Sequence, residues 1–155
     1  MIPRYRPDLP LPPYAFHPGG PWPHPISDPA GHSHGVRPEP LEPITNENAT
    51  AHPTHRRAID LFNHGFYREA HEVWESLWMA AGRRGPTADF LKGLIHLAAA
   101  GVKIREGVPA GVRSHGARAA ELFAPFTEPI MLGLELAQVR RIAGWLRDER
   151  DIVNI

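Results

Sequence analysis

Proline is unevenly distributed along this chain of 155 residues, and its distribution restricts what each part can fold into. Thirteen of the eighteen prolines lie within the first 50 residues. Proline fixes φ and lacks the N–H donor that helices and sheets need. The sequence therefore predicts an irregular, polyproline-II-like arm over residues 1–51, followed by a helical domain over residues 52–155.

The arm contains aromatic residues that a purely solvated segment does not need. They are Tyr5, Tyr14, Phe16 and Trp22. Two alternatives stay open. The arm is either a flexible tail, or it is laid over its own domain or over a neighbouring subunit, with these aromatic residues as anchors and a homo-oligomer as one outcome. His32 and His34, in a glycine-rich loop, are a weak pattern for a bound metal ion.

The rest of the chain has apolar residues at helical spacing in five segments. These segments are 53–64, 66–81, 86–105, 109–123 and 135–148. The third is apolar over more than half of its circumference, which is typical of a central helix. The apolar stretch 130–134 is expected to cap the bundle. No run of residues alternates with period two, so essentially no β-sheet is predicted. The predicted fold class is all-α, a compact orthogonal or antiparallel bundle of about five helices.

The segment from Phe66 to Trp78 has the densest cluster of chemically capable side chains. Along one edge of its apolar stripe lie Tyr67, His71, Glu75 and Trp78, with Trp74 in the stripe and Glu72 pointing away from it. Residues four apart on a helix are neighbours, so His71 and Glu75 can hydrogen-bond or share a ligand. The candidate catalytic residues are His71, Glu72 and Glu75, and the candidate binding residues are Tyr67, Trp74 and Trp78.

Three interpretations of this cluster compete: a structural network, an acid–base or small-molecule site, and a metal site. The pattern lacks the second histidine of His-Glu-x-x-His, and also the repeated Glu-x-x-His of di-iron bundles. His96 or His115 would have to turn inward to complete a metal site, and His96 is expected on a wet strip of its helix. Buried polar groups are normally paired, which favours a network of His71, Glu75 and Tyr67. No metal or other cofactor is predicted.

Charge and composition exclude several classes of function. Basic and acidic residues balance at 17 each, so no basic field is available to attract nucleic acid. The longest apolar stretch, residues 94–102, is far shorter than the ~20 residues of a membrane span. The N-terminus lacks the apolar segment of a secretory signal, and the chain has no cysteine. We therefore expect a soluble cytoplasmic protein with neither nucleic acid nor membrane as a partner.

Two motifs resemble those of the domain of unknown function 309 family. They are Leu61-Phe62-Asn63-x-Gly65-x-Tyr67-x-Glu69-Ala70-His71-Glu72-x-Trp74-Glu75-x-x-Trp78 and Phe90-Leu91-x-Gly93-Leu94-Ile95-x-Leu97-Ala98-Ala99. The resemblance covers about residues 55–125 and implies a compact all-helical prokaryotic domain, with no established activity, cofactor or substrate. The position of His96 is commonly glutamine in such proteins, which weakens a metal role for it.

These observations predict a non-enzymatic binding or scaffold module with a buried network of histidine, glutamate and tryptophan. The alternative is a metal-assisted or acid–base hydrolase that uses His71, Glu72 and Glu75. The two hypotheses differ in what surrounds the histidine: close packing favours the module, and an open pocket favours chemistry.

Overall fold

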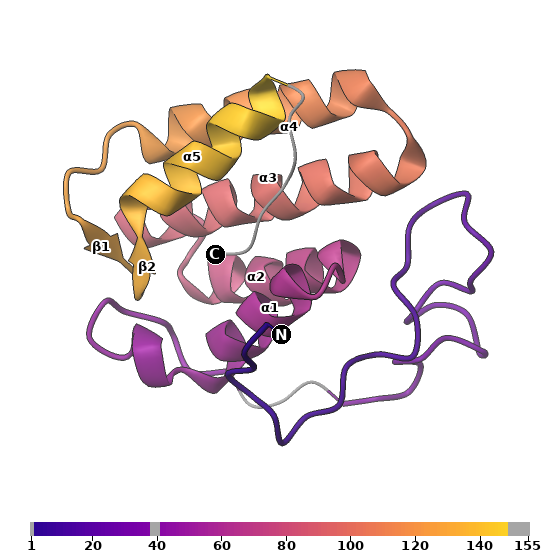
Figure 1. Cartoon of the computed structure of the whole chain (residues 1–155). Coiled ribbons are helices and arrows are strands. Elements are labelled where there is room, and N and C mark those ends of the chain that lie inside the picture. Colours follow the sequence, from indigo (N-terminus) through magenta and orange to yellow (C-terminus); the bar gives the residue numbers. More distant parts are fainter. Residues whose placement is uncertain (1, 38–40, 149–155) are drawn as a thin grey trace.

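The computed structural model describes residues 2–37 and 41–148 and shows a helical bundle with a long N-terminal arm (Figure 1). Its elements are η1 (Ala49–Ala51), α1 (Pro53–Asn63), α2 (Tyr67–Ala80), α3 (Pro86–Glu106), α4 (Pro109–Phe123), β1 (Ile130–Met131), β2 (Leu134–Glu135) and α5 (Leu136–Arg147). The predicted all-α class is confirmed, and each of the five α-helices lies within a few residues of its predicted range.

A short connection joins α1 to α2. Pro53 begins α1, where its missing N–H breaks no helical hydrogen bond. Gly65 follows the end of α1 with φ +85°, a left-handed conformation that glycine adopts at little cost. The N–H groups of Gly65 and Phe66 donate back to the carbonyls of Phe62 and Leu61, which closes the turn. The two helices therefore pack against each other directly.

α3 is the central helix, as its broad apolar surface predicts. It packs against α2 on one side and α4 on the other, and it also contacts α5 (Figure 1). Two small residues let its neighbours approach closely. Gly93 lies against the ring of Phe123, and Gly101 lies against the ring of Tyr67.

A two-residue antiparallel hairpin is the point where the structure differs from the prediction of no sheet. Strand β1 pairs with β2, and each strand is too short to leave an alternating pattern in the sequence. Leu132 and Gly133 form the turn with φ +48° and +73°. Leu132 tolerates this conformation because its side chain is buried and its N–H donates to Asn46 Oδ1 at 2.8 Å. The predicted cap is confirmed by the buried residues Met131, Leu132 and Leu134.

Two buried carboxylates, on α1 and α2, bind the arm, whose backbone path is drawn in Figure 1. Asp60 of α1 accepts hydrogen bonds from the backbone N–H groups of Tyr5 and Arg6, both at 2.7 Å. Glu69 of α2 accepts from the N–H of Phe16 at 2.9 Å. Of the alternatives left open by the sequence, the structure shows an arm laid over its own domain.

The aromatic residues of the arm pack mostly on one another. The rings of Tyr14 and Trp22 stack with their centroids 4.9 Å apart, and Phe16 packs edge-on against His24 at 5.1 Å. Trp22 is 52% exposed and Tyr5 is 41% exposed. These two residues are therefore not the anchors that the sequence predicts, and the backbone of the arm takes that role.

The contact between α4 and α5 depends on one glycine. A Cβ at Gly116 would collide with the backbone nitrogen of Arg147 and lie 2.8 Å from the backbone carbon of Leu146. A Cβ at Gly144 would meet its nearest atom at an ordinary 3.7 Å.

Gly116→Ala should therefore lower the free energy of unfolding by about 1–3 kcal/mol, because the two helices must separate. The matched change Gly144→Ala should raise it by about 0.5–1 kcal/mol, since alanine is the better helix former. Urea denaturation followed by circular dichroism measures both changes. A Gly116→Ala protein as stable as Gly144→Ala would contradict this close approach.

Candidate functional site

His71 and Glu75 form the hydrogen bond that their spacing predicts. The distance from His71 Nε2 to Glu75 Oε2 is 3.0 Å, and the two side chains are 23% and 43% exposed. Burial, and then the charge of Arg68, lowers the pKa of His71 below its usual value, although Glu75 acts in the opposite direction. The pair thus lies at the edge of the bundle and stays accessible to water.

Two further histidines meet across α3 and α4. The Nδ1 atoms of His96 and His115 are 2.9 Å apart, so one ring donates its proton to the other. Burial, and then His115, lowers the pKa of His96 to about 4, and burial also lowers the pKa of His115. The charge of His71 also lowers the pKa of both histidines. Because such an effect requires proximity, the three histidines lie on one side of the bundle. The sequence places His96 on a wet strip, but the structure half-buries it against α4.

His96 pairs with His115, whereas His71 pairs with Glu75. Within residues 2–37 and 41–148, no group of three or more histidine, aspartate or glutamate side chains is arranged to hold a metal ion. His32 and His34 of the arm also have separate partners: His34 Nδ1 contacts the carbonyl of Ile26 at 2.7 Å. Over the same residues, no helix has the length and apolar character that a membrane span requires.

Tyr67 and Trp78 have different cationic partners. The guanidinium of Arg105 lies 5.6 Å from the centre of the Tyr67 ring. Burial raises the pKa of Tyr67, and Arg105 partly offsets this effect. Trp78 faces the ammonium of Lys92 at 4.6 Å, an interaction typical of a partly exposed aromatic ring.

A buried histidine–tryptophan network exists, and its histidine is His55. The indole N–H of the fully buried Trp74 donates to His55 Nδ1 at 3.1 Å, and Nε2–H of His55 donates to the carbonyl of Leu132 at 2.9 Å. Burial lowers the pKa of His55 to about 4. The members of this network differ from the predicted ones, which were His71, Glu75 and Tyr67. His55 was missed because its partners are distant in sequence.

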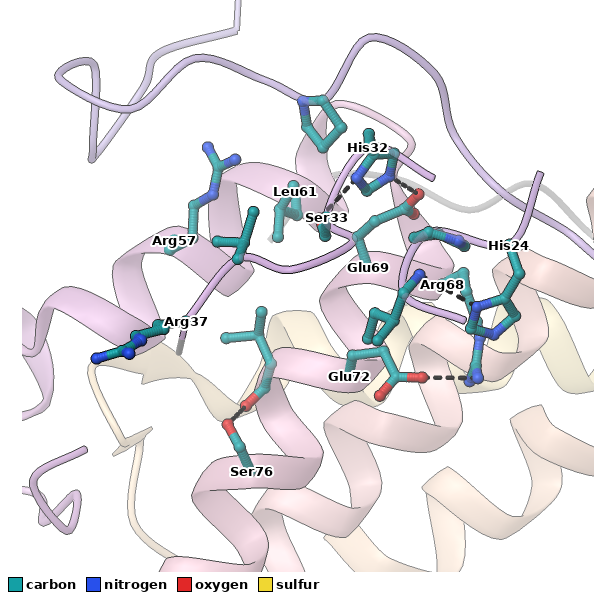
Figure 2. Close-up of a pocket in the computed structure, with 15 residues that line it drawn as sticks. His24, His32, Ser33, Arg37, Arg57, Leu61, Arg68, Glu69, Glu72 and Ser76 are labelled. Carbon is teal, nitrogen blue, oxygen red and sulfur yellow. Dashed lines mark hydrogen bonds and ion pairs between the residues drawn. The ribbon is translucent and has the colours of Figure 1, made fainter. Parts of the chain in front are cut away.

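A pocket of about 570 Å³ opens between the arm and helices α1 and α2 (Figure 2). Its apolar wall consists of Pro12, Pro25, Ile26 and Val36 from the arm, with Leu61 and Val73 from the helices. Of the candidate catalytic and binding residues predicted from the sequence, only Glu72 lines it. The sequence could not reveal this pocket, because one of its two walls is formed by the path of the arm.

His32 joins the arm to α2 inside this pocket (Figure 2). Its Nε2 lies 3.2 Å from Glu69 Oε1, and its Nδ1 lies 2.7 Å from Ser33 Oγ. The side chains of His32 and Glu69 are only 5% and 8% exposed. The second oxygen of Glu69, Oε2, is buried without a hydrogen-bond partner among the described residues. The one sign in the sequence was the run His32-Ser33-His34, which suggested a metal ion instead.

Fold and site together define an all-helical domain with a proline-rich arm that covers a pocket. Residues 55–115 match the family described as Domain of unknown function (DUF309), which confirms the resemblance that the sequence motifs predict. No curated protein and no solved structure matches the chain. The arm residues that line the pocket lie outside the matched segment.

Proposed function

We propose that this protein binds a small, mainly apolar carboxylic acid in the pocket beneath the arm. The observation that carries the proposal is a mostly apolar pocket whose charged groups leave an excess of positive charge. Its volume, about 570 Å³, lies within the range of roughly 300–1,000 Å³ that small-molecule sites occupy.

The charge balance of the pocket favours an anionic group on the ligand. Both carboxylates already have cationic or N–H partners: Glu72 pairs with Arg68 at 2.6 Å, and Glu69 contacts His32. Arg37 makes no hydrogen bond or ion pair with the residues that the structure describes, and it lies at the pocket (Figure 2). A guanidinium matches the two oxygens of a carboxylate in geometry as well as in charge. A carboxylic acid with an apolar body therefore fits both the wall and the charge.

Calorimetric titration with octanoate tests this proposal on the full chain. Octanoate should bind and raise the melting temperature, whereas octanol and octylamine should bind at least about tenfold more weakly, a difference of roughly 1.4 kcal/mol. Arg37→Glu should abolish the preference for the acid. Arg84→Glu, the same charge change at an exposed loop position outside the pocket, should leave binding unchanged. Octanoate binding that survives Arg37→Glu would contradict the assignment of the anionic group.

A second variant tests the pocket itself. Ser76 lines the pocket from α2 and is only partly buried, so a larger side chain there extends into the cavity. Ser76→Trp should prevent octanoate binding while the circular dichroism spectrum stays that of a folded helical protein. Unchanged binding to Ser76→Trp would place the ligand elsewhere.

The hydrolase predicted from His71, Glu72 and Glu75 has less support. His71 and Glu75 contact each other at the edge of the bundle, while Glu72 pairs with Arg68 in the pocket. The three side chains thus serve two different places, so no observation favours a shared catalytic role for them.

A further inference from the structure

We infer that Ser33, His32 and Glu69 form a nucleophilic relay that hydrolyses esters of small apolar carboxylic acids. This inference rests on the binding function proposed above, because the acyl group of the ester would occupy the same pocket. The three residues lie in the wall of that pocket, with Ser33 and His32 on the arm and Glu69 on α2 (Figure 2).

The contacts give each residue the role that such a relay requires. Glu69 Oε1 accepts a hydrogen bond from His32 Nε2–H at 3.2 Å. This contact favours the tautomer of His32 that carries its proton on Nε2. Nδ1 is then the free base, and it lies 2.7 Å from the Ser33 hydroxyl. A nucleophile in contact with a base, and a base oriented by a carboxylate, is the arrangement that activates serine in hydrolases. Serine proteases use the two ring nitrogens in the opposite order, but the roles follow from the contacts.

The base and its carboxylate are held rigidly. Glu69 Oε1 also accepts the N–H of Phe16 at 2.9 Å, and the backbone N–H of His32 donates to the Tyr14 hydroxyl at 3.1 Å. The ring of Tyr14 packs against the His32 ring with centroids 4.7 Å apart. A catalytic group gains most from such fixed geometry, since no reorganisation is needed during reaction.

Among the residues that the structure describes, the Ser33 hydroxyl makes no hydrogen bond besides the one with His32 Nδ1. The loop is held by the backbone N–H of Ser33, which donates to the carbonyl of Pro25 at 2.9 Å. The contact that attaches the arm to α2 runs through His32 and Glu69. Ser33 is partly exposed at the pocket, so its oxygen is accessible to a bound molecule.

The reaction consumes one water and needs no other co-reactant. Ser33 Oγ attacks the ester carbonyl carbon while its proton moves to His32 Nδ1. The C–O bond to the alcohol breaks, and the departing oxygen takes that proton, which leaves an acyl group on Ser33. A water molecule, deprotonated by Nδ1, then attacks the acyl carbon, and Ser33 recovers the proton as the carboxylic acid leaves. The acid formed is the class of ligand for which Arg37 provides the opposite charge.

Hydrolysis of 4-nitrophenyl octanoate and labelling by a fluorophosphonate test the inference on the full chain. The wild type should release nitrophenolate and take up one label, which peptide mass spectrometry should locate on Ser33. Ser33→Ala should lose the label and at least about 100-fold in rate, the range expected when a nucleophile and its base no longer cooperate. Glu69→Gln should slow hydrolysis less, because it keeps an acceptor for His32.

Matched controls separate this relay from hydrolysis by surface groups. Ser27→Ala, in the same arm, and His34→Ala, beside the relay, should keep the wild-type rate. Ser33→Ala should still bind octanoate, which shows that its pocket is intact. Wild-type protein that binds octanoate but is neither labelled nor active would overturn the relay and leave the binding function standing. Failure to bind octanoate would refute the binding function, and a rate unaffected by Ser33→Ala would refute the relay.

Discussion

Asp60→Ala should release the first part of the arm from the helical domain and lower the free energy of unfolding by about 3–5 kcal/mol. Asp60 is fully buried and accepts the N–H groups of Tyr5 and Arg6, both at 2.7 Å, with Arg4 Nε at 3.3 Å. Hydrogen bonds to a charged group contribute roughly 1.5–3 kcal/mol each, and this change removes two of them together with the ion pair.

Urea denaturation and limited trypsin digestion measure the two parts of this expectation. The variant should be cleaved rapidly after Arg4, whereas the helical bundle should resist digestion and keep its circular dichroism signal. Asp148→Ala removes an exposed carboxylate that contacts Arg147, and it should change neither stability nor cleavage. An Asp60→Ala protein with a protected arm would show that other contacts hold the arm in place.

Acidification from pH 6.5 to 4.5 should lower the free energy of unfolding by about 2–3 kcal/mol through His55 alone. The pKa of this buried histidine is lowered from 6.5 to about 4, chiefly by burial. Above pH 6.5 the ring is neutral in both the folded and the unfolded chain, so its full contribution is present. Below pH 6.5 the unfolded chain takes up a proton that the folded protein resists, at about 1.4 kcal/mol per pH unit. The loss levels off near the folded pKa.

The geometry explains why the folded protein resists this proton. A second proton on His55 would occupy Nδ1, the atom that accepts the indole N–H of Trp74. Urea denaturation at a series of pH values measures the slope of the free energy of unfolding against pH. His55→Gln should be less stable at pH 7 but should lose less stability on acidification. Because His96 and His115 also have lowered pKa values, a remaining slope is expected. A variant slope equal to the wild-type slope would contradict the role of His55.

The arm shows how polar contacts can replace a hydrophobic core. Residues 2–37 contain no helix or strand, so their backbone N–H groups need partners elsewhere. Asp60 and Glu69 provide some of those partners from inside the helical domain, and the pocket forms where the arm passes over α2. Holding the arm and shaping the candidate site are therefore linked through the same carboxylate, Glu69.

Local patterns were sufficient for the helices and for the hydrogen bond between His71 and Glu75. Apolar spacing, Pro53 and Gly65 mark helices and their ends through interactions within a few residues, so these features can be read from neighbouring positions. The hairpin at Leu132 and Gly133 was not predicted, because two residue pairs are too few to produce an alternating pattern in the sequence.

Contacts between distant residues could only come from the folded chain. The pairing of His55 with Trp74, of His96 with His115, and of His32 with Glu69 joins side chains 19 or more positions apart. Which histidine is buried, and which serine faces a pocket, depends on how helices pack and where the arm runs. Packing is set by the sum of many long-range contacts, whereas helix formation follows from short-range periodicity. That difference is why the bundle was predictable and the pocket was not.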